Sequence, residues 1–413
     1  MAHKRSLDSP NKSVKEKRES LKSHLTCESF KHLDLKFTFS KSISTSSPMK
    51  GVKKKVEKND ANRISDYLVQ KVSVILESVG THEFNIFELD EYIGKKCMYY
   101  VATSVFNSLE LESLYEKEKF TNFITEIANG YNREVDYHND LHACDVFQVS
   151  YVMISQGNLK VKLKLHDIDI FAVLLAAICH DFKHPGVNNI YLVNTKSSIA
   201  IRYNGKLIVL MCLDSSVLEN YHVAQTFKVL LKPENNLLDK LTPEEYRLVR
   251  RRMIETIIAT DMANHGKDLS ALKTKIDTFE IKGGKNVNLM VFEDNVQKTY
   301  ENQQAVLSMC VHCADISNPT KNELMNKIWL DLVFKEFFKQ GDEERKLGLQ
   351  ITLLCDRQTT NINKSQIGFI NFAVKPAYDA LLQFIPEISI YMDIMKENLK
   401  RFENLVKEEV KSK

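Results

Sequence analysis

Apolar residues recur at helical spacing over most of the chain. The period is clear at residues 62–79, 302–314, 326–338 and 366–384. The longest uninterrupted apolar run, Ile170 to Cys179, has ten residues, which suits a buried helix but is too short to span a bilayer. No segment alternates apolar and polar residues as a half-buried strand would, and no repeat of roughly 20–50 residues is found. The pattern therefore predicts an all-α protein.

One helix start can be located from residue types alone. Thr242 is suited to accept a hydrogen bond from a free backbone N–H group, and Pro243 fits the first helical position. Glu245 completes the pattern of a capping box. We expect a helix to begin at Pro243.

Composition supports the same fold class. The chain has 13 Gly and 8 Pro in 413 residues, about 5% together, whereas an average protein has roughly 12%. Because Gly and Pro form the tight turns between short strands, this low content argues against a β-sandwich or barrel and excludes a collagen-like chain. The apolar content of 43% is enough for a large core.

Charge divides the chain into two parts. The net charge is +3, but residues 1–60 contain 15 Lys and Arg against 7 Asp and Glu. Because this segment is also rich in Ser, we predict a disordered basic tail at 1–60 and a single large helical domain at 61–413. The domain is then mildly acidic, which argues against nucleic-acid binding. The tail leaves open a contact with an anionic membrane or with a kinase.

The eight cysteines do not form a zinc-binding frame. Cys310 and Cys313 make a lone C-x-x-C within an apolar helical pattern, and several other cysteines lie in apolar runs. Such thiols are typical of a reducing compartment. With no signal peptide or transmembrane segment evident, we expect a cytoplasmic location.

Residues suited to metal binding occur in three places, each at the end of an apolar helix. His138 and His142 are four residues apart, so on a helix they would share one face. His180-Asp181 directly follows the Ile170–Cys179 run, and Asp315 ends another apolar segment. Each piece alone is more often structural, but their order, H…HD…D, resembles the signature of the HD-type metal-dependent phosphohydrolases. His and carboxylate ligands without Cys suit a catalytic divalent ion, because they leave positions open for water.

Further motifs extend this match over about residues 65–408. They are Tyr137-His138-Asn139 with His142-Ala143 and Asp145-Val146, His180-Asp181 with His184-Pro185-Gly186-Val187, Val217-Leu218-Glu219-Asn220, Ala259-Thr260-Asp261-Met262, the run from His312 to Lys321, Glu336-Phe337-Phe338 with Gln340-Gly341-Asp342, and the run from Ser365 to Ile370. In these residues the chain resembles the catalytic domain of the class I 3′,5′-cyclic-nucleotide phosphodiesterases. The resemblance implies a single all-α domain of about sixteen helices that hydrolyses the 3′ phosphoester of a cyclic nucleotide to the 5′-monophosphate and so terminates signalling.

The resemblance also implies two divalent ions, Zn²⁺ at the tighter site and Mg²⁺ or Mn²⁺ at the second. The residues that would hold the tighter ion are His142, His180, Asp181 and Asp315. Asp181 would bridge to the second ion, and His184 and Glu219 would orient its waters. A hydroxide activated by the two ions would attack the phosphorus. His138 is expected to be the general acid, with Glu336 accepting a hydrogen bond from its other ring nitrogen and keeping it protonated.

Six residues are expected to contact the substrate: Tyr137, Met262, Asn318, Val333, Gln366 and Phe369. The amide of Gln366 would bind the purine edge, and Val333 and Phe369 would clamp the base from both sides. The resemblance also favours cAMP over cGMP, because family members that prefer cAMP often carry Asn at the position of Asn318, where an amide could pair with the adenine edge.

Three positions depart from the family pattern. Lys183 stands where Asp is usual, so its cation either points into solvent or weakens metal binding. Tyr221 replaces a common His. The longer connection at 203–213 is either a partner or homodimer surface or an extension of a helix.

Two alternative functions stay open: another HD-type nucleotide phosphohydrolase, and a non-catalytic cyclic-nucleotide-binding protein.

Overall fold

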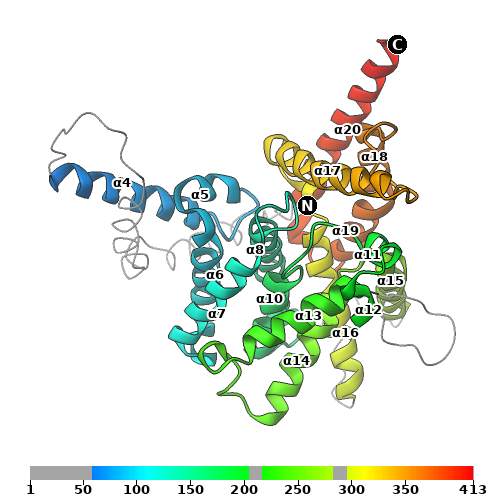
Figure 1. The fold of residues 1–413 in the computed structure, drawn as a ribbon. Coiled ribbons are helices and arrows are strands. Elements are labelled where there is room, and N and C mark those ends of the chain that lie inside the picture. Colours follow the sequence, from blue (N-terminus) through cyan, green and yellow to red (C-terminus); the bar gives the residue numbers. More distant parts are fainter. Residues whose placement is uncertain (1–57, 204–215, 282–294, 413) are drawn as a thin grey trace, which may run out of the picture.

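The computed structural model describes residues 58–203, 216–281 and 295–412. Within these ranges the regular elements are helices, and no strand is found (Figure 1). The all-α prediction is therefore confirmed. The predicted tail lies outside the described residues except for its last three positions, and so does the 203–213 connection except for Tyr203.

Most of the described helices are joined by short turns, whereas the connection from α17 to α18, residues 347–361, is longer. The α-helices are α4 (Lys58–Glu77), α5 (Ile86–Ile93), α6 (Cys97–Ser108), α7 (Lys117–Gly130), α8 (Asp140–Gln156), α9 (Leu159–Lys162), α10 (Asp167–Cys179), α11 (Asn189–Asn194), α12 (Ser198–Tyr203), α13 (Val217–Leu230), α14 (Pro243–Ile258), α15 (His265–Ile281), α16 (Val296–Asp315), α17 (Glu323–Lys346), α18 (Ile362–Phe369), α19 (Lys375–Leu382) and α20 (Ser389–Lys411). A π-helical segment, η7 (Ile370–Val374), joins α18 to α19, and the 3₁₀ turns are η1 (Gly94–Lys96), η2 (Leu111–Leu114), η3 (Pro233–Asn235), η4 (Met262–Asn264), η6 (Asn318–Thr320) and η8 (Pro386–Ile388).

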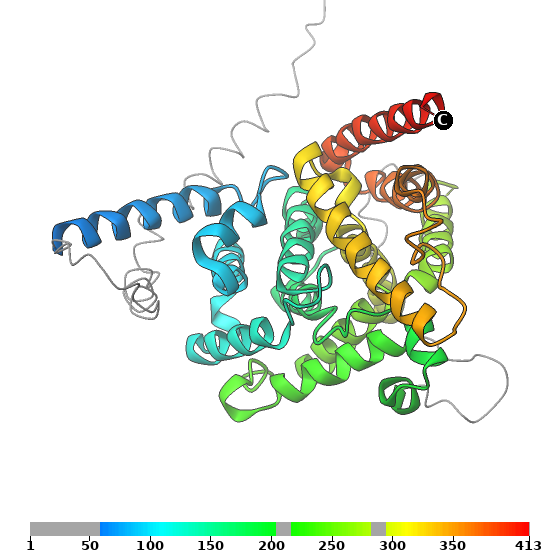
Figure 2. The same ribbon diagram turned by 45° about the horizontal axis from the view of Figure 1, so that its top comes forward.

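Helix α10 lies at the centre of the fold (Figures 1 and 2). Every residue from Ile168 to Cys179 is buried, as expected for a helix that is apolar on all faces. It packs against α8, α14 and α16. Because His142 is in the first turn of α8, His180 follows the end of α10 and Asp315 ends α16, the packing of these helices brings three ligand-bearing ends together.

Capping interactions determine where the relevant helices begin. The predicted box at α14 is present: the hydroxyl of Thr242 accepts from the N–H of Glu245, whose carboxylate accepts from the N–H of Thr242 at 2.8 Å. At α8 the side-chain oxygen of Asn139 accepts from the N–H of Leu141 at 2.9 Å. Since α8 starts there, His142 points from its first turn.

Two buried ion pairs fix the packing around α8 and α10. Lys321 pairs with Asp145 of α8 at 2.6 Å, and both side chains are 2% exposed. Arg252 of α14 pairs with Asp169 of α10 at 2.6 Å, again with both side chains buried. Removal of one partner from such a pair leaves an uncompensated buried charge, at a cost of about 3–5 kcal/mol. The Lys321 pair holds the turn after Asp315 against the helix that carries His142.

Gly341 of α17 allows the closest approach of two chain segments. A Cβ atom at this position would lie 1.9 Å from the carbonyl oxygen of Cys355. We therefore expect Gly341→Ala to lower the free energy of unfolding by about 1–3 kcal/mol, because the backbones must separate. Gly266→Ala is the control, since no atom lies within 4 Å of its Cβ position. Denaturant unfolding would measure both, and equal stability of the two variants would contradict the contact.

The outer ends of the first and last described helices extend away from the body (Figures 1 and 2), while Val72 of α4 and Tyr391 of α20 are buried in the core. α4 and α20 project on different sides in both views (Figures 1 and 2).

Among the described residues, none of the helices combines the length and apolar character needed to cross a bilayer. Six cysteines in these ranges are free and buried, in agreement with the interpretation of the cysteines as buried thiols.

Candidate metal centre and active site

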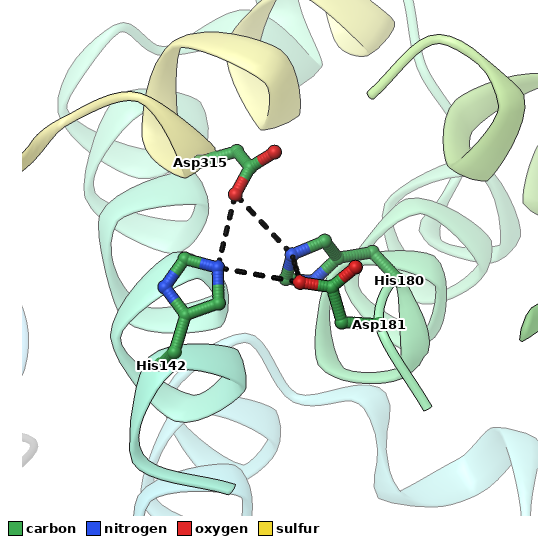
Figure 3. A group of neighbouring side chains, drawn as sticks. All are labelled: His142, His180, Asp181 and Asp315. Atoms are coloured by element: carbon green, nitrogen blue, oxygen red, sulfur yellow. Dashed lines mark hydrogen bonds and ion pairs between the residues drawn. The ribbon is translucent and has the colours of Figure 1, made fainter. Parts of the chain in front are cut away.

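Four predicted ligands converge from three separate parts of the chain (Figure 3). The Nε2 atom of His142 lies 3.0 Å from Asp315 Oδ1 and 3.5 Å from Asp181 Oδ2. The Nε2 atom of His180 lies 3.1 Å from Asp181 Oδ2 and 3.4 Å from Asp315 Oδ1. Both imidazoles are buried, whereas the two carboxylates are partly exposed. The structure thus brings together the complete set predicted for the tighter ion.

His180 shows that this group is built for a cation. Its Nδ1 atom lies 2.9 Å from the carbonyl oxygen of Ala177, so that nitrogen carries the proton and donates it. The Nε2 atom is then left with a lone pair that faces Asp181 and Asp315. It is buried and has no hydrogen-bond partner among the described residues. An orphaned acceptor between two carboxylates is stabilised by a metal ion.

The distances among the four atoms also fit an ion. Ligands about 2.0–2.1 Å from a tetrahedral Zn²⁺ lie about 3.4 Å from one another, and the observed separations run from 3.0 to 3.5 Å. Burial opposes ionisation of Asp181 and Asp315, but positive charge between the two imidazoles lowers the pKa of both carboxyls, whether that charge is a proton on His180 or a bound cation. Both groups are therefore available as ionised ligands.

A second group of possible ligands shares Asp181. It consists of Asp181, His184 and His222. The His222 Nε2 atom is 3.6 Å from Asp181 Oδ1, while its Nδ1 atom lies 2.8 Å from the carbonyl oxygen of Phe182. Burial lowers the pKa of His184 to about 3 and of His222 to about 4, so both rings are neutral at physiological pH. His222 was not predicted. The one signal for it was its position three residues after Glu219, on the same face of α13.

Glu219 lies in the first turn of α13 and is held by a neighbour that sequence reasoning did not find. The Nδ2 atom of Asn189 lies 3.2 Å from one carboxylate oxygen of Glu219 and 3.5 Å from the other. Burial, and then the nearby Asp261 carboxylate, raise the pKa of Glu219 to about 8. Glu219 makes no direct contact with the four predicted ligands among the interactions of the described residues.

His138 is oriented by Glu336 in a single arrangement. Nδ1 of His138 lies 2.5 Å from Glu336 Oε1, and Glu336 Oε2 accepts from the backbone N–H groups of Tyr137 and His138 at 2.8 and 3.0 Å. The His138 ring stacks on His184, with centroids 4.1 Å apart. Burial lowers the pKa of His138, but the Glu336 carboxylate outweighs this and raises the pKa to about 9. The Glu336 carboxylate therefore favours the protonated form of His138.

The His138–Glu336 pair leads to a testable pH dependence. A general acid with a pKa near 9 stays protonated below that pH and is lost as the pH rises through it. We expect Glu336→Gln to lower this pKa, so that the alkaline limb of kcat moves to lower pH by at least about one unit. A pH–rate profile of both proteins would measure the shift. An unchanged alkaline limb would contradict the role of Glu336.

Of the six residues expected to contact substrate, all of them within the described ranges, a hydrogen bond joins only Tyr137 and Asn318 to one another. Tyr137 and Asn318 are in contact, because Asn318 Nδ2 donates to Tyr137 Oη at 2.7 Å. Gln366 on α18 is buried, whereas Val333 on α17 and Phe369 on α18 are half-buried. Met262 in η4 is 45% exposed. Among the described residues, none of these last four side chains makes a hydrogen bond to the metal-ligand group.

The two departures within the described ranges leave the ligands intact. Lys183 is exposed, has a φ of 63° and lies with Nζ 5.5 Å from the Phe182 ring, so its charge points into solvent. An L-residue rarely adopts this left-handed conformation, and Asp tolerates it better than Lys. Tyr221 is half-buried and lies beside His222.

A cavity of about 870 Å³ lies elsewhere, between α14, α15 and α16. Its lining includes His265 and His312, whose rings meet at 2.8 Å. None of the predicted site residues lines it. We therefore place the candidate site at the group of metal ligands and not at this cavity.

Comparison with known proteins agrees with the geometry. A family model described as 3′5′-cyclic nucleotide phosphodiesterase matches residues 137–395. Among curated proteins, two Drosophila melanogaster relatives, 3′,5′-cyclic-AMP phosphodiesterase isoform F and isoforms N/G, are each 32% identical over 339 residues, or 81% of this chain. The matched regions cover 48% and 33% of those relatives, so the chain spans about half of their length or less.

Solved structures give the same result for the fold. The structure of LmjPDEB1 in complex with IBMX has a TM-score of 0.68 and 26% identity, and the match covers 80% of this chain and 93% of that one. The phosphodiesterase domain of the RhoPDE fusion protein from the choanoflagellate Salpingoeca rosetta has a TM-score of 0.69 and 27% identity, with 81% and 97% covered.

Proposed function

Because the chain belongs to the 3′,5′-cyclic nucleotide phosphodiesterase family, we propose that it hydrolyses a 3′,5′-cyclic nucleotide to the 5′-monophosphate. The observation that carries the proposal is the convergence of His142, His180, Asp181 and Asp315 next to His138, whose Nδ1 atom is paired with Glu336. The ring centroids of His138 and His142 are 5.6 Å apart. A cation-binding group and a proton donor side by side are what cleavage of an anionic diester requires.

The side chains divide the chemistry between them. Two divalent ions, Zn²⁺ held by the four ligands and Mg²⁺ or Mn²⁺ next to Asp181, would neutralise the phosphate and supply a water that ionises near neutral pH. His138 would donate a proton to the leaving 3′ oxygen from Nε2, since its Nδ1 proton is held by Glu336. Glu219 would accept hydrogen bonds from the waters around the second ion, whereas His184, whose Nδ1 accepts from the N–H of Gly186 at 3.0 Å, would donate to them from Nε2.

Asn318 supports a preference for cAMP. Its Nδ2 atom donates to Tyr137, which leaves Oδ1 free of hydrogen bonds among the described residues. A free acceptor suits the amino group at the adenine edge and opposes the carbonyl oxygen of guanine. Gln366 would contact the same base edge, between Val333 and Phe369, and Tyr137 and Met262 would line the pocket.

A comparison of substrates with and without chelator tests the proposal. We expect purified protein to hydrolyse cAMP with a higher kcat/KM than cGMP, to leave a nucleoside triphosphate intact, and to lose activity with a chelator. Metal analysis of the same sample should find bound divalent ions. Hydrolysis of the triphosphate alone would favour another HD-type phosphohydrolase. Binding of cyclic nucleotide without turnover, in protein with its metals in place, would favour a non-catalytic binding protein.

A further inference from the structure

Asn189 links two parts of the site through the two ends of its amide. The Oδ1 atom accepts from the backbone N–H of Leu218 at 2.8 Å, at the start of α13. The Nδ2 atom donates to the carboxylate of Glu219, the next residue, at 3.2 Å. One side chain from α11 thus satisfies an N–H group at the beginning of α13 and also directs the carboxylate beside it.

Asn188, the preceding residue, is fixed from a different direction. Its backbone N–H donates to Gln340 Oε1 at 2.9 Å, and Gln340 Nε2 donates back to Asn188 Oδ1 at 3.1 Å. Gln340 belongs to α17 and is 3% exposed. This reciprocal pair joins residues 152 positions apart in the sequence.

Gln340 is itself held by a buried carboxylate. Its Nε2 atom lies 2.9 Å from Glu344 Oε1, and Glu344 also accepts from the backbone N–H and the hydroxyl of Thr352 at 2.7 and 2.6 Å. Glu344 is 1% exposed. The amide of Gln340 is therefore not free to rotate, and the position of the Asn188-Asn189 backbone is fixed relative to α17.

We propose that Asn189 is a positioning residue for the second metal ion: it holds the Glu219 carboxylate in the orientation that binds the waters of that ion, and Gln340 anchors it there. This inference rests on the proposed function for the role of Glu219. A carboxylate on a flexible side chain has several rotamers, and a donor from a fixed neighbour selects one of them. Outer partners of this kind commonly change metal affinity by about 10–100-fold.

A metal titration tests this without any turnover. The protein is loaded with one equivalent of Zn²⁺, and Mn²⁺ binding is then followed by electron paramagnetic resonance. We expect Asn189→Ala and Glu219→Gln each to weaken Mn²⁺ binding by about 10–100-fold. Because Asn189 acts through Glu219, the double variant should bind Mn²⁺ no more weakly than Glu219→Gln alone. Additive losses, or unchanged binding in Asn189→Ala, would overturn the proposal.

Two further variants separate positioning from stability. Asn85→Ala removes a helix-capping Asn at α5, whose Oδ1 accepts from Phe87 and Glu88, and it should leave Mn²⁺ binding unchanged. Gln340→Leu removes the hydrogen bonds to Asn188 and leaves Asn189 unchanged, so it should also weaken Mn²⁺ binding. If Asn189→Ala does not fold, this variant tests the proposal in its place. If the Mn²⁺ results hold while the wild-type protein hydrolyses no cyclic nucleotide, the proposed function fails and the positioning role stands.

Discussion

Asp181→Asn is expected to lower kcat for cyclic-nucleotide hydrolysis by about 10³ or more. Asp181 lies within reach of three imidazoles, with its Oδ2 atom near His142 and His180 and its Oδ1 atom near His222. It is thus shared by two of the three groups of possible ligands, the third being His138, His184 and Glu336. An amide has one neutral acceptor oxygen in place of two charged ones, so both ions would be held less well. Loss of their charge stabilisation costs several kcal/mol, and about 4 kcal/mol corresponds to 10³ in rate.

Metal content and rate measured together check this expectation. The purified Asp181→Asn variant should contain less bound metal than the wild type, and excess Mn²⁺ should restore only part of the rate. Asp268→Asn is a matched control on α15, where the half-buried carboxylate belongs to neither group of ligands. Full metal content with full activity in Asp181→Asn would show that the ion is held elsewhere.

His138→Gln is expected to lower kcat by about 10²–10⁴, the usual contribution of a general acid. His138 is not one of the four residues around the tighter ion, so metal content should stay at the wild-type level. The loss should fall mainly on kcat, because the proton is needed when the bond to the leaving oxygen breaks. The combination of full metal and low rate distinguishes this variant from Asp181→Asn.

The leaving group provides a sharper readout. A substrate analogue whose leaving oxygen is more acidic needs less protonation, so His138→Gln should lose much less activity with it than with cAMP. His166→Gln serves as control, since His166 caps the start of α10, about 20 Å from His180 along a helix of this length. Near-full turnover of cAMP by His138→Gln would rule out the acid role.

The outcome for individual residues shows which parts of the site a sequence can predict. His142, His180, Asp181 and Asp315 were found because they stand in short motifs whose order, H…HD…D, resembles that of a known family, and each motif is complete within a few residues. The start of α14 was found for the same reason, since a capping box is complete within four residues.

Partners that depend on packing were missed. His222 is next to Asp181 only because α13 packs against α10, and Asn189 is next to Glu219 only because the start of α11 meets the start of α13. The π-helical segment at 370–374 also interrupts a stretch that the apolar period predicts as one helix. None of these features has a signature within a short window of sequence.

The separation of the ligands along the chain has a consequence for how the protein matures. His142 and Asp315 are 173 residues apart, and their side chains meet only after α8, α10 and α16 have packed. Because these distant residues meet only when the helices pack, we expect the unfolded chain to lack the complete four-residue group and the metal to bind mainly to the folded protein. Metal would then act as a ligand of the native state. The free energy of unfolding would rise with the logarithm of the free metal concentration, and degradation of the protein in the cell would slow.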